Sequence, residues 1–191
     1  MKRLRSIAFF LFFSIIASCK NDDESTLNKK IDFDKESIKI MDTIRPNLLG
    51  LWKATEIKVR PSSAQTNEIG IVKDTILTDT LELRINSIDN SDQSAARNEV
   101  SGVLSFRSKN YPVGFTMHAA PERIVKKVGS PVIGLLEYRF PVGSHLTEPE
   151  ESYLNNLLMN DNYYMEVSDD RQKMIWKGLN RAVESIKFVR Q

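Results

Sequence analysis

The chain has 191 residues, in which 27 Lys and Arg stand against 25 Asp and Glu. This near-neutral balance argues against a nucleic-acid-binding protein, which normally shows a basic excess or a basic stripe. The single Cys excludes an intrachain disulfide and a Cys-rich metal site, and 2 His leave little material for a His-based one. The length suits one domain, with or without tails.

Residues 1–18 have the parts of an export signal. A positive head contains Lys2, Arg3 and Arg5, and an apolar run interrupted only by Ser14 follows over residues 7–17. At about 1.5 Å per residue, a helix over this run covers roughly half of a bilayer core. The run is therefore too short for a transmembrane helix, and we interpret it as the core of a signal peptide.

The segment Ile16-Ala17-Ser18-Cys19 ends this signal and resembles the lipobox of bacterial lipoproteins. The resemblance implies cleavage before Cys19, two acyl chains on its thiol and usually a further acyl group, such as palmitate, on its amine. Two or three chains attach a protein to a membrane effectively permanently, because each buried methylene adds about 0.8 kcal/mol. We therefore expect a lipid anchor in the outer membrane, on its periplasmic or cell-surface face. The alternatives are a plain secretory signal with a chance Cys and an N-terminal hydrophobic tail.

Residues 19–46 are predicted to be a charged linker. Between residues 20 and 45, 13 of 26 residues are charged and neither Gly nor Pro occurs. Such a segment buries too little apolar area to offset its ordering entropy, so a mostly extended tether is expected. Scattered apolar residues, among them Phe33 and Met41, leave open a short helix or strand that docks on the body. The acidic residues 21–24 resemble the export signals of surface-displayed lipoproteins; the alternative is a solvated spacer.

Residues 47–191 are predicted to form an all-β domain. Apolar and polar residues alternate, most clearly where Leu81, Leu83 and Ile85 share one side of a strand over 77–86. About eight strands are expected, at 51–59, 77–86, 102–107, 113–119, 136–142, 163–167, 174–176 and 186–190. Turn residues separate them at 89–90, 109–110, 129–131, 143–144, 169–170 and 178–180; Asp169-Asp170 is interpreted as a hairpin turn and not as a calcium site.

One helix is predicted over residues 148–159. Thr147 and Glu150 have the spacing of a capping box, in which each side chain accepts a hydrogen bond from the other residue's backbone amide. Leu154, Leu157 and Leu158 then fall on one face, and Asn160 is a plausible stop.

Many short antiparallel strands with little helix indicate a barrel, with a β-sandwich as the alternative. The first strand opens with Gly50-Leu51-Trp52, and Arg190 is one residue from the end of the chain. The body resembles the lipocalin-like (calycin-type) domains of bacterial lipoproteins. In that family a Gly-x-Trp indole packs under the barrel and an Arg of a late strand lies across it.

The resemblance implies that Gly50, Trp52 and Arg190 close the barrel, with the first and last strands as neighbours. Cation–π stacking of this kind contributes roughly 0.5–2 kcal/mol. In the alternative, Trp52 is an ordinary core aromatic and Arg190 a solvated charge. The predicted helix precedes three strands, whereas lipocalins usually have their main helix before the last one.

No catalytic residue, metal ligand or cofactor site is predicted. The familiar nucleophile-elbow, phosphate-binding, zinc-protease and dinucleotide motifs do not occur. His118 is expected on the polar face of its strand and His145 in a loop. The enzymatic alternative is a hydrolase with two carboxylates that meet across the barrel, drawn from single acidic residues such as Glu82 and Glu166.

Five aromatic residues are candidates to line a ligand cavity: Phe115, Tyr138, Phe140, Tyr163 and Trp176. They are either plain core or cavity walls, since a closed sheet of this size can hold one small apolar ligand. The sequence therefore predicts a lipid-anchored barrel, with no nucleic-acid partner, that binds a small lipophilic ligand. The alternative is a filled barrel that binds a protein or glycan through its loops.

Overall fold

The computed structural model describes residues 31–89 and 97–191 of the chain. The chain divides into two compact units, and the second, Ile31–Gln191, contains all of these residues. The predicted signal peptide, Cys19 and the acidic residues 21–24 lie outside the described residues, as does Asn90 of one predicted turn. Among the described residues, no helix is both long enough and apolar enough to cross a bilayer.

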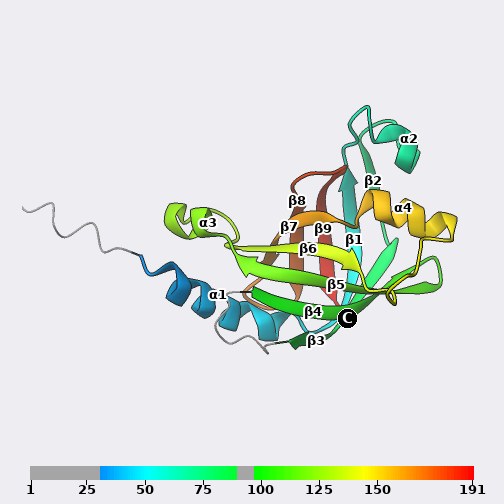
Figure 1. Ribbon diagram of the computed structural model, residues 1–191. Helices are drawn as coiled ribbons and strands as arrows, with labels where there is room; N and C mark the ends of the chain where they lie inside the picture. The colour runs from blue at the N-terminus through cyan, green and yellow to red at the C-terminus, as the bar shows by residue number, and fades with distance from the viewer. Residues whose placement is uncertain (1–30, 90–96) are drawn as a thin grey trace, which may run out of the picture. The chain divides into compact units, whose positions relative to one another are not determined.

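The described unit is an antiparallel sheet with four helices (Figure 1). The strands are β1 (Gly50–Val59), β2 (Thr75–Leu77), β3 (Leu81–Asp89), β4 (Arg97–Phe106), β5 (Lys109–Ala119), β6 (Val132–Tyr138), β7 (Asp161–Val167), β8 (Lys173–Gly178) and β9 (Val183–Arg190). The helices are α1 (Phe33–Leu48), α2 (Thr66–Ile69), α3 (Pro121–Lys126) and α4 (Pro149–Leu157).

The sheet closes on itself. Its strand order is β2-β1-β3-β4-β5-β6-β7-β8-β9, and β1 also pairs with β9 from Trp52↔Arg190 to Val59↔Val183. Strands β1 and β3 to β9 thus form an eight-stranded antiparallel barrel, which is compatible with a lipocalin-like fold. The predicted all-β barrel is confirmed against the sandwich alternative.

The edge of β1 opposite β9 is shared by two strands. Strand β3 pairs with Gly50–Lys53, and the short β2 pairs with Ile57–Val59. Between them residues 78–80 leave the sheet, so the single strand predicted over 77–86 is wrong. The interruption places a turn at the rim of the barrel.

The interior of the barrel is filled by large side chains. The Trp176 ring lies 5.5 Å from Phe115, 5.4 Å from Tyr163 and 5.1 Å from Phe188, measured between ring centroids. All four residues are buried. Gly134 makes room for Met165, whose terminal methyl carbon would lie 2.5 Å from an added Cβ. The centre is therefore packed in the manner of a protein core.

Helix α1 packs against β5 and β7 at one end of the barrel. It begins at Asp32, whose carboxylate accepts a hydrogen bond from the Lys35 amide at 3.1 Å, and it buries Met41 and Leu48. This helix corrects the prediction of a mostly extended linker up to residue 46. The alternative, a helix that docks on the body, is the one observed. Buried apolar residues recur on one face of this helix and contact the barrel.

Helices α2 and α4 contact each other at the opposite end. The cap of α4 differs from the prediction by one residue. Glu151, not Glu150, accepts from the Glu148 and Thr147 amides, at 3.2 and 2.8 Å, and the helix starts at Pro149. The adjacent glutamates offer two equivalent capping registers, and the sequence pattern does not distinguish them.

Two further predictions are corrected at this end of the barrel. Strand β6 starts earlier than expected and stops at Tyr138, so Phe140 and the fully exposed Val142 lie beyond it. The β4–β5 turn is made by Arg107 and Ser108 in the left-handed region, with φ of 48° and 68°, and not by residues 109–110. The turns predicted at 129–131, 143–144 and 169–170 do lie in connections between elements, and the turn predicted at 178–180 follows directly after Gly178, the last residue of β8.

Candidate functional site

The three residues proposed to close the barrel lie together. The guanidinium of Arg190 lies over the Trp52 ring, and the Trp52 Nε1–H donates to the backbone oxygen of Leu48 at 2.7 Å. An added Cβ at Gly50 would lie 3.0 Å from Nη1 of Arg190, and Gly50 has a φ of 126°. This cluster holds the first and last strands together at the α1 end. Its hydrogen-bonding groups are used within the protein, so we regard it as structural.

Three of the five candidate lining residues form the filled interior. Phe115, Tyr163 and Trp176 are all buried and in mutual ring contact through Trp176. The Tyr163 hydroxyl donates to the backbone oxygen of Leu158 at 2.8 Å, and burial raises the pKa of Tyr163 well above 10. These rings occupy the place that a ligand at the barrel centre would take.

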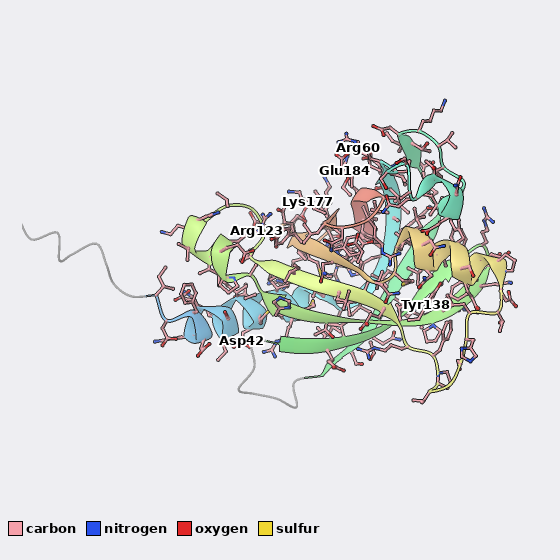
Figure 2. The ribbon with its side chains drawn as sticks, turned by 45° about the horizontal axis from the view of Figure 1, so that its top comes forward. Asp42, Arg60, Arg123, Tyr138, Lys177 and Glu184 are labelled. Atoms are coloured by element: carbon pink, nitrogen blue, oxygen red, sulfur yellow. The ribbon has the colours of Figure 1, made fainter. Side chains whose placement is uncertain are left out.

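The other two candidates lie near α4. Tyr138 is half-buried, donates to the backbone oxygen of Glu151 at 3.0 Å, and has a raised pKa because of burial (Figure 2). Phe140 stacks on it with ring centroids 4.7 Å apart. The pair closes one side of the barrel end beneath α4.

A pocket of about 350 Å³ opens at this α4 end, and we call it the mouth pocket. Its lining comprises Leu77, Asp79, Thr80, Phe106, Arg107 and Tyr153. A second cleft of about 270 Å³ shares four of these residues and continues over the outer face of β1, β3 and β4 toward Lys53, Glu82 and Ser105. Three chain segments distant in sequence thus meet at one opening: the β2–β3 turn, the β4–β5 turn and α4.

Local backbone geometry builds this opening. Asp79, Arg107 and Ser108 are non-glycine residues with φ between 48° and 68°; Asp79 and Arg107 line both clefts, and Ser108 lines the second. Such conformations carry strain and are often found at binding sites. The Phe106 and Tyr153 rings stack with centroids 5.9 Å apart and planes 20° from parallel. Together with Leu77 they form the apolar walls.

The cationic side chains near the opening differ in whether they have an ion-pair partner. The Lys53 ammonium lies 2.9 Å from Asp79, which raises the pKa of Lys53. Lys109 is paired with Glu148 and lies 3.6 Å from Glu150. The Arg107 guanidinium lies 5.0 Å from the Phe106 ring centroid and, among the described residues, has no hydrogen bond or ion pair.

The two histidines and Glu166 noted in the sequence lie away from this opening. His118 is exposed on β5 and His145 is exposed in the loop before α4. Glu166 is paired with Lys177 at 3.1 Å on neighbouring strands. Within residues 31–89 and 97–191, no group of three or more His, Cys, Asp or Glu side chains is placed to hold a metal ion.

The mouth pocket could not be predicted from the sequence, because the residues of its walls also fit the patterns of a regular strand or helix. Leu77 and Phe106 read as strand residues and Tyr153 as a position on an amphipathic helix. One signal was available: Thr78-Asp79-Thr80 interrupts the apolar alternation, and it marks the turn that opens the rim.

Comparisons with known proteins found no match to any protein family, to any curated protein or to any solved structure. The class of protein is therefore given by the fold itself, an eight-stranded antiparallel barrel with a helix at each end.

Proposed function

We propose that this protein is a lipid-anchored envelope lipoprotein whose barrel binds a small lipophilic ligand in the mouth pocket, without catalysis and without a cofactor. The observation that carries the proposal is a pocket with three apolar walls at the end of a barrel whose centre is already filled. The ligand position thus moves from the barrel centre to its rim.

The dimensions and lining support this role. Small-molecule sites typically measure about 300–1,000 Å³ and combine apolar walls with a few polar groups. The mouth pocket, at about 350 Å³, lies at the lower end of that range. Leu77, Phe106 and Tyr153 supply the apolar surface, while Thr80 and Arg107 supply polar atoms. A short alkyl chain or a single ring fits this description better than a long lipid.

The anchor is tested by labelling cells with an alkyne analogue of palmitate. The native chain should incorporate label and Cys19→Ala should not. Ser18→Ala, which keeps a small residue before the Cys, should remain labelled. Equal labelling of Cys19→Ala would exclude acylation at this residue.

Ligand binding is tested on the mature chain carrying Cys19→Ala, which lacks only the signal and the acyl groups. NMR titration with octanamide, a neutral amphiphile, should shift resonances around Leu77, Phe106 and Tyr153. Tyr153→Ala removes one wall and should weaken binding several-fold, whereas Tyr164→Ala on β7 should leave it unchanged. No shift at the mouth pocket with any chain length from butanamide to dodecanamide would overturn the proposal.

A second candidate function is a loop-mediated contact with a protein or glycan. It is favoured by exposed apolar residues in the segments at the same end of the barrel: Val72, Ile76, Val142 and Leu146. In that case Val142→Asp should abolish a crosslinked partner in envelope extracts and leave octanamide binding intact.

A further inference from the structure

We propose that the mouth pocket selects a small amphipathic molecule with one negative charge, whose carboxylate binds Arg107. The inference rests on the proposed function, since it names the chemistry of the ligand in the same pocket. Three observations carry it: a cation and a buried hydroxyl that have no ion-pair or hydrogen-bond partner among residues 31–89 and 97–191, and apolar walls beside both.

The cation is the Arg107 guanidinium. It extends from the β4–β5 turn over the Phe106 ring and lines both clefts. Neighbouring ammonium groups are neutralised, Lys53 by Asp79 and Lys109 by Glu148. A backbone hydrogen bond within Glu150 and the charge of Lys109 lower the pKa of Glu150, with the smallest contribution from Arg107; Glu150 is within ion-pair distance of Lys109 and not of Arg107. A planar guanidinium with free donors matches a carboxylate in two parallel hydrogen bonds.

The hydroxyl is that of Thr80. Its Oγ1 is buried and has no hydrogen-bond partner within the described part of the chain. Buried polar atoms are rarely left without a partner, so an unpaired one beside a pocket indicates a group or water that completes it. Thr80 lines both clefts together with Arg107. A carboxylate held by Arg107 offers an oxygen that can accept from this hydroxyl.

The walls define the rest of the ligand. Leu77, Phe106 and Tyr153 present one apolar side chain and two stacked rings to the space next to Arg107. A ligand whose apolar part lies against these walls has its carboxylate within reach of Arg107. A polyanion fits less well, because Glu82 flanks the opening and Lys53 is already paired with Asp79. The site therefore favours a monocarboxylate over a phosphate ester or a dicarboxylate.

The test compares octanoate with octanamide, which share a chain and differ in the charge of the head. On the mature chain carrying Cys19→Ala, octanoate should bind roughly five- to tenfold more tightly, since charge-assisted hydrogen bonds are about twice as strong as neutral ones and an exposed pair is partly screened. Arg107→Gln should remove this advantage, because it lowers the affinity for octanoate more than the affinity for octanamide. Lys126→Gln on α3 is the matched loss of one charge away from the pocket and should preserve the advantage.

The outcomes separate the two proposals. Salt should weaken octanoate binding and not octanamide binding, as expected for an exposed ion pair. Equal affinities for the two probes, unaltered by Arg107→Gln, would overturn the carboxylate inference and leave the pocket itself in place. Failure of both probes to shift mouth-pocket resonances would overturn the proposed function. An unchanged unfolding transition for Arg107→Gln confirms that the comparison reports binding.

Discussion

The guanidinium carbon of Arg190 lies 4.4 Å from the centre of the Trp52 ring, which places the last strand directly on the first. The two residues are also register partners in the β1–β9 ladder. Arg190 further donates to three backbone oxygens: those of Asn47 at 2.5 Å, Leu49 at 2.7 Å and Arg171 at 2.8 Å. One side chain thus ties the end of α1, the start of β1 and the β7–β8 turn to the seam of the barrel.

Replacing Arg190 should therefore destabilise the whole barrel. Arg190→Ala leaves three carbonyl oxygens without their donor and exposes the indole face, so we expect a loss of about 3 kcal/mol in the free energy of unfolding. Arg190→Lys keeps the charge but cannot reach three acceptors with one ammonium, and it should recover only part of the loss. Urea unfolding monitored by tryptophan fluorescence measures both.

Lys187→Ala on the same strand provides the control. Lys187 pairs with Glu56 at 2.9 Å on the outer surface, and such exposed pairs contribute about 0–1 kcal/mol. Similar losses for Arg190→Ala and Lys187→Ala would show that Arg190 acts as an ordinary surface charge.

Gly50 should be intolerant of any side chain. Its φ of 126° disfavours L residues, and an added Cβ would lie 3.0 Å from Nη1 of Arg190. Gly50→Ala should cost about 1–3 kcal/mol, the range for a strained backbone position. Gly143→Ala is the matched control for backbone strain without a contact, because Gly143 has a φ of 86° and no atom of the described residues lies within 4 Å of the added Cβ.

A double-mutant cycle separates strain from contact at Gly50. If the contact with Arg190 contributes, Gly50→Ala should cost less in the Arg190→Ala background than in the native chain. Strictly additive losses would assign the whole effect to backbone strain.

The barrel could be predicted from the sequence because closure depends on patterns that are local and periodic. Alternation along β3 to β9 defines an inner face, and the positions of Trp52 and Arg190 near the two ends of the body indicate neighbouring strands. Helix α1 could not be predicted with the same ease. Its apolar residues are diluted by charges, and it is ordered by contacts with distant strands, not by local preference.

The mouth pocket depends on information that strand patterns do not contain. It requires the β2–β3 interruption to lie beside the β4–β5 turn and under α4, which is a matter of three-dimensional register. From sequence alone, the aromatic residues Phe115 and Trp176 fit both a core and a cavity wall, since burial and ligand contact favour the same residue types. Only the ring contacts distinguish these roles.

Trp176→Ala tests whether the centre of the barrel is packed. Removing a buried indole in contact with Phe115, Tyr163 and Phe188 should cost about 3–5 kcal/mol and leave a cavity. Octanamide binding at the mouth pocket should persist as long as the variant is folded. A loss below about 1 kcal/mol would instead indicate a loosely filled interior.

The buried Tyr163 should make the protein sensitive to alkaline pH. Burial raises the pKa of Tyr163 well above 10, so the folded state keeps its proton at a pH where the unfolded chain releases it. The contribution is complete below the unfolded value of 10 and is lost as the pH rises beyond it. Each unit of pH above that value should lower the free energy of unfolding by up to about 1.4 kcal/mol from this residue.

Tyr163→Phe removes this dependence and also the 2.8 Å hydrogen bond to the Leu158 oxygen. The variant should be about 1 kcal/mol less stable at neutral pH, and the difference should shrink or reverse in alkaline solution. Tyr153→Phe is the matched control, because Tyr153 is half-buried and should alter the alkaline slope less. Urea unfolding across neutral and alkaline pH gives both slopes. Parallel stability curves for the native chain and Tyr163→Phe would mean that water reaches the phenol of Tyr163. The interior of the barrel would then not be packed, and the reason for placing the ligand at the rim would be lost.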